Sequence, residues 1–209
     1  QARKYKMSLK LYTNSFSRGV VVDWLLIELG IECERIEVAY KTEMKTPEYL
    51  KMNPFGKVPV LVDGDVVVYE LGAIVAYLAD KFPEKGLAPA LNDPKRGIYY
   101  RWLFFISGPW EAAATDRMLG INEVTPEQKS SIGYGDYQDA YHAFVVGLNE
   151  ATPFLCGEQF TAADVLVAAM LFWQLKMGEV QSHPAIERYL QNVSQRPSYQ
   201  KFAEFFSNA

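Results

Sequence analysis

Two neighbouring motifs combine residue types that could bind a small peptide. The first is Asn-Pro-Phe-Gly-Lys-Val-Pro over residues 53–59. Pro59 cannot donate a hydrogen bond to a sheet, so it must lie at the start or the edge of a strand. We expect the Val58–Pro59 bond to be cis, which turns the backbone N–H and C=O of Val58 outward. An extended peptide could then pair with them as an added strand would.

The second motif is Glu-Leu-Gly-Ala-Ile over residues 70–74, where a predicted strand ends and a helix begins. Free N–H groups and the dipole at the start of a helix favour a ligand carboxylate. The side chain of Glu70 can bind an ammonium group beside that carboxylate. Together the two motifs offer groups for a peptide backbone, a carboxylate and an amine.

The elements that must position these motifs follow from the spacing of apolar residues. Asp-Gly-Asp at residues 63–65 is a strong hairpin signal between two of the strands. Strands are expected over residues 9–13, 34–38, 58–62 and 66–69, and helices over residues 17–29, 47–52 and 70–81. The order βαβ, α, ββα predicts a mixed four-stranded sheet, because the crossover joins parallel strands and the hairpin joins antiparallel ones.

The second half of the chain is expected to be entirely helical. Proline and glycine crowd residues 84–94, which we interpret as a linker. Helices are predicted over residues 95–117, with a bend at Gly108-Pro109, over residues 126–148, and over residues 165–175 after a capping box formed by Thr161 and Asp164. The predicted domains are therefore an α/β domain over residues 7–83 and an all-α domain over residues 95–209.

The two motifs, in this order and spacing, resemble the glutathione-binding half of the cytosolic glutathione S-transferase superfamily. The resemblance extends over nearly the whole chain. It implies a thioredoxin-like N-terminal domain, a C-terminal helical bundle, and a cytoplasmic, homodimeric transferase that acts in detoxification. Ser-Phe-Ser-Arg at residues 15–18, followed by a Trp and a Glu-Leu-Gly helix end, is similar to the cyanobacterial chi class, which points to a bacterial type.

The resemblance also assigns roles in glutathione binding. Val58 corresponds to the residue whose backbone pairs with the cysteinyl part, and Glu70 and Leu71 correspond to the pair that holds the γ-glutamyl end. Lys45 and Lys57 stand where polar or basic residues reach the glycine carboxylate.

Two positions depart from the family pattern. Leu71 replaces the usual serine. The leucine keeps the backbone N–H but lacks the hydroxyl, whose hydrogen bond is worth about 1 kcal/mol. Met44 stands where many relatives carry histidine, so Lys45 would bear more of the carboxylate contact. We therefore expect a reduced affinity for glutathione rather than loss of the site.

Thiol activation is expected near the start of the first helix. Ser17 could donate its hydroxyl to a thiolate and Arg18 could add a positive charge, with Ser15 and backbone N–H groups next in order. Tyr12 lies inside the first strand, where its side chain is less suited to reach the sulfur. An electrophile pocket is assigned to Phe105 and Trp110, although most of the surrounding aromatic cluster is expected to be core or dimer packing.

The composition argues against nucleic acid and a membrane as partners. The net charge of −4 over 209 residues does not favour nucleic acid, and no apolar run reaches the ~18 residues of a membrane span. Cys33 and Cys156 form no metal-ligand or C-x-x-C pattern, so no metal site is expected and the cysteine usage fits a reducing compartment, the cytoplasm. Two alternatives to the transferase stay open: a non-catalytic glutathione or ligand carrier, and a glutathione-dependent thiol–disulfide reductase, for which residues 14–18 supply no cysteine.

Overall fold

The computed structural model describes residues 9–121 and 124–207. The chain forms two compact units. One takes the residues up to Phe82 together with those from Pro197 onward, and the other is Pro83–Arg196. Each unit has its own core and is described separately below.

The first unit is an α/β unit whose predicted strands and helices are all found, with ends shifted by at most three residues. Its elements are β1 (Leu9–Thr13), α1 (Val20–Leu29), β2 (Glu34–Glu37), the 3₁₀ turn η1 (Glu43–Lys45), α2 (Pro47–Met52), β3 (Val60–Asp63), β4 (Val66–Tyr69), α3 (Leu71–Lys81) and α10 (Pro197–Ser207).

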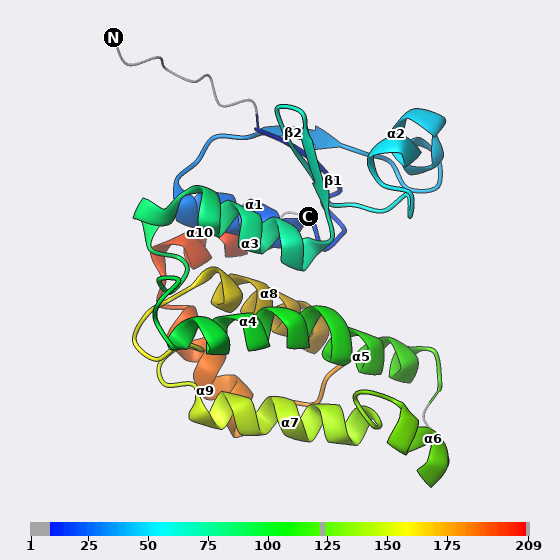
Figure 1. Ribbon diagram of the computed structural model, residues 1–209, viewed down its shortest axis with the longest axis vertical. Helices are drawn as coiled ribbons and strands as arrows, with labels where there is room; N and C mark the ends of the chain where they lie inside the picture. Colours follow the sequence, from blue (N-terminus) through cyan, green and yellow to red (C-terminus); the bar gives the residue numbers. More distant parts are fainter. Residues whose placement is uncertain (1–8, 122–123, 208–209) are drawn as a thin grey trace. The chain divides into compact units, whose positions relative to one another are not determined.

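The four strands form one mixed sheet in the order β2-β1-β3-β4. β1 pairs with β2 in parallel and with β3 antiparallel, and β3 pairs with β4 antiparallel, as the crossover and the hairpin require. Helices α1, α3 and α10 lie side by side along the sheet (Figure 1). This arrangement confirms the predicted thioredoxin-like fold with a mixed four-stranded sheet.

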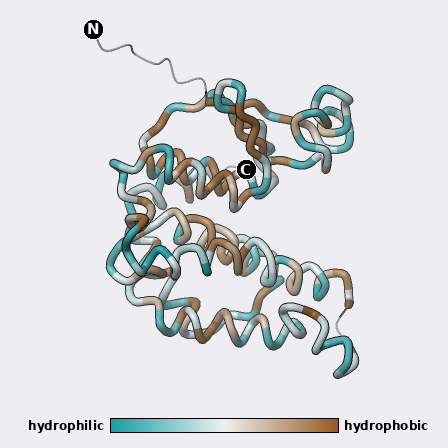
Figure 2. The backbone as a smooth tube through the Cα atoms, in the orientation of Figure 1, coloured by the Kyte–Doolittle hydropathy of each residue, from teal (hydrophilic) through white to brown (hydrophobic). Residues whose placement is uncertain are grey.

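Alternation along the strands divides the unit's interior into two layers. Leu9 and Leu11 are completely or almost completely buried on one face of β1. On the other face, Tyr12 joins a buried cluster that contains Met44 and Tyr49. The hairpin strands β3 and β4 carry a run of hydrophobic colouring in Figure 2.

The last helix belongs to the first unit, whereas the sequence placed all residues from 95 to 209 in the helical domain. Trp24 of α1 is completely buried, and its ring stacks on that of Phe202 in α10 with centroids 4.8 Å apart. Its indole N–H donates to Ser198 Oγ at 2.9 Å. Helical spacing shows that α10 has an apolar face but not which core receives it, so the sequence could not assign this helix.

The regular elements described in the second unit are all helices. They are η2 (Pro83–Lys85), α4 (Lys95–Phe105), the π-helical turn η3 (Ile106–Trp110), α5 (Glu111–Met118), α6 (Pro126–Ser131), α7 (Tyr137–Glu150), α8 (Ala162–Lys176) and α9 (Pro184–Val193). Two isolated β-bridges, Phe154–Gly157 and Cys156–Gln159, lie in the loop before α8. The segment Leu87–Asp93, inside the predicted linker, is already part of this unit: the Leu87 carbonyl accepts the Ala162 N–H at 2.7 Å.

Two of the predicted helices are interrupted. The bend expected at Gly108-Pro109 is found as η3, since a proline removes a helical N–H and a π-helical turn accommodates the gap. The prediction of one helix over residues 126–148 is wrong. Gly135 adopts φ +73°, and Asp136 caps α7 by accepting the N–H of Asp139 at 2.9 Å, so a new helix begins there.

The predicted capping box at the start of α8 is confirmed. Asp164 is completely buried, and its carboxylate accepts the N–H of Thr161 at 2.9 Å, the N–H of Leu155 at 3.0 Å and the hydroxyl of Tyr189 at 3.0 Å. Burial nevertheless raises the pKa of Asp164 to about 6. The box therefore joins the loop before α8 to α9 and has a folding role.

Candidate functional site

Three segments of the first unit converge at one end of the sheet. The register pairs Tyr12 of β1 with Val60 of β3, and Val60 with Tyr69 of β4. The end of β1, the beginning of β3 and the end of β4 therefore lie next to one another. The predicted binding residues of all three segments follow or precede these paired positions by a few residues, so the sheet register brings them together.

The loop between β1 and α1 (residues 14–19, the β1–α1 loop) is organised by Asn14. Its side-chain amide donates to the Val38 carbonyl at 3.0 Å, and its Oδ1 accepts the N–H of Phe16 at 3.0 Å. Its carbonyl accepts both the N–H and the hydroxyl of Ser17, at 3.0 and 2.7 Å. Asn14 was missed in the sequence; an Asn directly after a strand is the signal, because its side chain can bond the backbone two residues on.

Ser17 lies in this loop, not at the first position of the helix. α1 begins at Val20, and the Ser17 hydroxyl donates to the Asn14 carbonyl and accepts the N–H of Gly19 at 3.0 Å. The side chain is partly exposed, and that of Arg18 is exposed. To donate to a thiolate, the Ser17 hydroxyl must release the Asn14 carbonyl.

The backbone before β3 has the geometry that the sequence predicted. The Val58–Pro59 bond is cis. Among the described residues, none forms a hydrogen bond with the N–H or C=O of Val58. The preceding carbonyl, that of Lys57, accepts the hydroxyl of Tyr49 at 2.7 Å and the amide of Asn53 at 2.9 Å, which fixes the segment from inside.

Lys45 bonds to the protein's own backbone. Its ammonium donates to the carbonyls of Phe55 and Gly56, both at 3.0 Å. Gly56 has φ +58°, and a Cβ there would lie 2.6 Å from the Met44 carbonyl. Met44 itself is only 2% exposed and belongs to the buried cluster, so it contributes packing where a histidine would contribute a polar group.

Glu70 has an unusual backbone at the junction of β4 and α3. Its φ of 74° and ψ of 115° lie where side chains other than glycine are strained, and its exposed side chain makes no cap bond to α3. The N–H groups of Leu71 and Gly72, at the start of α3, have no partner within the helix. An exposed carboxylate thus stands beside free backbone donors, as the sequence predicted. The side chain of Lys57 is exposed as well.

Both residues assigned to an electrophile pocket lie in the second unit, but they differ in burial. Trp110 is completely buried and donates its indole N–H to Gln174 at 2.9 Å, so its assignment to a pocket wall is not supported. Phe105 is partly exposed and lines a cavity of about 260 Å³ together with Trp102 and Val146. Aromatic spacing along a helix could not separate these two positions.

Neither a metal site nor a membrane span is found in the part of the chain that the structure describes. Within residues 9–121 and 124–207, no group of three or more His, Cys, Asp or Glu side chains is placed to hold a metal ion. No described helix is long and apolar enough to cross a membrane.

Comparisons with known proteins agree with this architecture. A family model described as glutathione S-transferase, N-terminal domain, matches residues 7–80, and the C-terminal domain model matches residues 138–197. The chain is 30% identical to glutathione S-transferase 3 of Zea mays, over 92% of both chains. It is 31% identical to a zeta-class glutathione S-transferase of Euphorbia esula, over 97% of this chain and 87% of that relative.

Solved structures give the same result. A glutathione transferase from Methylococcus capsulatus superposes with a TM-score of 0.76 at 28% identity, covering 96% of this chain and 100% of that one. The transferase URE2P6 of Phanerochaete chrysosporium, solved in complex with oxidized glutathione, has a TM-score of 0.77 at 25% identity and covers 97% and 98% of the two chains. A thioredoxin-like unit followed by a helical unit is the architecture they share. The chain belongs to the glutathione S-transferase family of enzymes.

Proposed function

We propose that this protein binds glutathione at the converging end of the sheet and activates its thiol for attack on apolar electrophiles. The observation that carries the proposal is the pair of unsatisfied backbone sites held at that end. These are the N–H and C=O of Val58 and the free N–H groups at the start of α3 beside Glu70. A peptide with a free amino-acid end matches both.

Each part of glutathione has a proposed partner. The cysteinyl backbone pairs with Val58, and the γ-glutamyl carboxylate accepts the N–H groups of Leu71 and Gly72 while its ammonium binds Glu70. Lys57 and Lys45 are proposed for the glycine carboxylate. Lys57 is the freer of the two, because Lys45 holds the Phe55 and Gly56 carbonyls.

Thiol activation requires a substantial electrostatic contribution from the β1–α1 loop. A free thiol has a pKa of about 8.5, and lowering it by ~2 units requires roughly 2.7 kcal/mol in favour of the thiolate. One neutral hydrogen bond supplies about 1 kcal/mol. The dipole of α1 and the Arg18 guanidinium are proposed to supply the rest. Ser17 stays the proposed donor, with the loop's backbone N–H groups as its competitors.

The proposal also covers the electrophile site, the oligomeric state, the compartment and the class of the enzyme. Phe105 is proposed to contact the electrophile, and a homodimer is proposed from the exposed aromatic residues of α4. Free thiols at both Cys33 and Cys156 support a reducing compartment, the cytoplasm, and a role in detoxification follows from the reaction. The bacterial, chi-like character rests on Ser-Phe-Ser-Arg over residues 15–18.

The decisive experiment combines retention on immobilised glutathione with turnover of an aryl halide. We expect both from the wild-type protein. Retention without turnover would replace the transferase with a ligand carrier. Turnover of disulfides alone would indicate a reductase instead of a transferase. Disulfide reduction normally uses a cysteine, which the β1–α1 loop lacks.

A further inference from the structure

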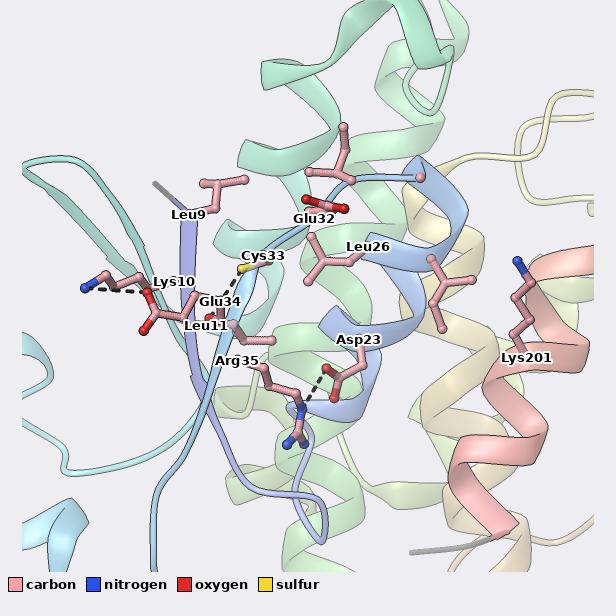
Figure 3. Close-up of a pocket in the computed structure, with 13 residues that line it drawn as sticks. Leu9, Lys10, Leu11, Asp23, Leu26, Glu32, Cys33, Glu34, Arg35 and Lys201 are labelled. Carbon is pink, nitrogen blue, oxygen red and sulfur yellow. Dashed lines mark hydrogen bonds and ion pairs between the residues drawn. The ribbon is translucent and has the colours of Figure 1, made fainter. Parts of the chain in front are cut away.

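A polar network on the edge strand β2 bonds directly to the β1–α1 loop. Glu37 accepts the backbone N–H of Ser15 through Oε1 at 2.9 Å. Arg35 donates from Nη2 to the Ser15 hydroxyl at 3.1 Å and from Nη1 to Glu37 Oε2 at 2.6 Å. The same guanidinium binds Asp23 Oδ1 of α1 through Nε at 3.1 Å (Figure 3). One arginine thus joins β2, α1 and the loop.

This network differs from an ordinary surface ion pair. The Asp23 side chain is only 11% exposed, and the Arg35 side chain is 30% exposed. Burial alone would raise the pKa of Glu37, but the Ser15 N–H and the Arg35 guanidinium outweigh it and lower that pKa below its usual value. A planar guanidinium with several fixed donors suits such a junction better than a flexible ammonium does.

Two other contacts also hold the β1–α1 loop. Asn14 bonds to Val38, and the hydroxyl of Tyr40 donates to the carbonyl of Phe16 at 3.1 Å. Neither contact binds the Ser15 N–H, which Glu37 accepts. Without Glu37, the segment leading to Ser17 and Arg18 gains conformational freedom, and preorganised donors lose their alignment.

We propose that Arg35 and Glu37 are positioning residues that hold the β1–α1 loop in the geometry that stabilises the glutathione thiolate. The proposal rests on the proposed function, since it concerns the activation step of that reaction. Neither residue needs to touch the substrate. Arg35 also offsets the negative charge that Asp23 and Glu37 would otherwise place near a developing thiolate.

The direction in which the pKa of the bound glutathione thiol changes distinguishes a positioning role of Glu37 from a purely electrostatic one. If Glu37 acted only as a negative charge, Glu37→Ala would lower the pKa of the bound glutathione thiol. Because we assign it a positioning role, we expect Glu37→Ala to raise that pKa and to lower kcat/KM for an aryl halide by about tenfold near neutral pH. We expect KM for glutathione to change less than kcat, because Val58 and Glu70 are untouched.

The test measures thiolate absorbance of bound glutathione against pH in the wild type, Glu37→Ala, Glu37→Gln and Arg35→Ala. Glu37→Gln keeps an acceptor for the Ser15 N–H, so it should restore part of the activation. The matched control is Glu34→Ala on the same strand, which removes the exposed Lys10–Glu34 pair at 3.7 Å and should leave the thiol pKa unchanged (Figure 3).

Hydrogen exchange of the free enzyme keeps the proposal testable apart from catalysis. The amides of residues 14–18 should exchange faster in Glu37→Ala and Arg35→Ala than in the wild type or the Glu34→Ala control. Unchanged exchange, or a thiol pKa that falls or stays constant, would overturn the positioning role. A wild type that does not turn over glutathione would instead overturn the proposed function, and the exchange result would still stand.

Discussion

Among single residues, Glu70 carries the most specific prediction because it combines an exposed carboxylate with a strained backbone. Replacing it by alanine should weaken glutathione binding tenfold or more, because the γ-glutamyl ammonium loses its charged partner. Calorimetry measures this dissociation constant. An unchanged value in Glu70→Ala would remove Glu70 from the site.

The backbone of Glu70 makes a second comparison available. Glu70→Gly also lacks the carboxylate, but glycine adopts a φ of 74° without strain. We expect Glu70→Gly to be more stable than Glu70→Ala by about 1 kcal/mol in denaturant unfolding, with glutathione binding equally weak in both. Equal stability of the two variants would mean that the strain is relieved by a local shift.

Ser17 and Arg18 can be distinguished by the pH dependence of kcat/KM. Loss of the true activator should raise the apparent thiol pKa, and Ser17→Ala should have the larger effect if its hydroxyl turns from the Asn14 carbonyl to the sulfur. If neither Ser17→Ala nor Arg18→Ala moves that pKa, the thiol is stabilised by backbone N–H groups of the loop, with Ser15 as the remaining side chain.

At the scale of elements, the turn before β3 requires glycine at position 56 because the backbone approaches closely there, and a comparison with Gly64 separates this effect from backbone strain. Gly56 and Gly64 have nearly the same φ, +58° and +59°, but a Cβ at Gly56 would lie 2.6 Å from the Met44 carbonyl, whereas at Gly64 nothing lies within 4 Å. Both changes to alanine incur left-handed strain of about 1 kcal/mol. Gly56→Ala should cost clearly more in unfolding free energy and should also weaken glutathione binding, because it displaces the loop that Lys45 holds. Equal destabilisation by the two variants would contradict the close approach at Gly56.

At the scale of the whole molecule, the prediction is a symmetric homodimer. The prediction is based on the aromatic residues of α4, which differ in burial. Tyr99 and Trp102 are buried in their own unit, while Phe104 is 74% exposed. Light scattering at micromolar concentration should give twice the chain mass of 23.7 kDa. Phe104→Glu should shift the mass towards the monomer, whereas Leu91→Glu, at a residue that is 83% exposed, serves as the control. A wild-type mass near that of one chain would overturn the dimer.

The sequence by itself determined the local features. The hairpin at Gly64, the capping box of Thr161 and Asp164, and the bend at Gly108-Pro109 depend on residues close together in the chain, where turn chemistry and helix capping act over four or five positions. The cis bond before Pro59, expected because it turns the Val58 backbone outward, is found. The motifs over residues 53–59 and 70–74 are also local, and they indicate the family without any tertiary contact.

Only the tertiary structure decided which partner each side chain takes. Apolar spacing marks α10 as amphipathic, but the stacking of Phe202 on Trp24 of α1 shows which unit it joins. Sequence types allow Lys45 and the Ser17 hydroxyl to reach a ligand, yet nearby carbonyls already accept hydrogen bonds from both. Arg35 meets Asp23 and Ser15 because a parallel crossover sets β2 beside β1. Contacts between residues distant in the chain depend on register and packing, which composition and spacing do not encode one residue at a time.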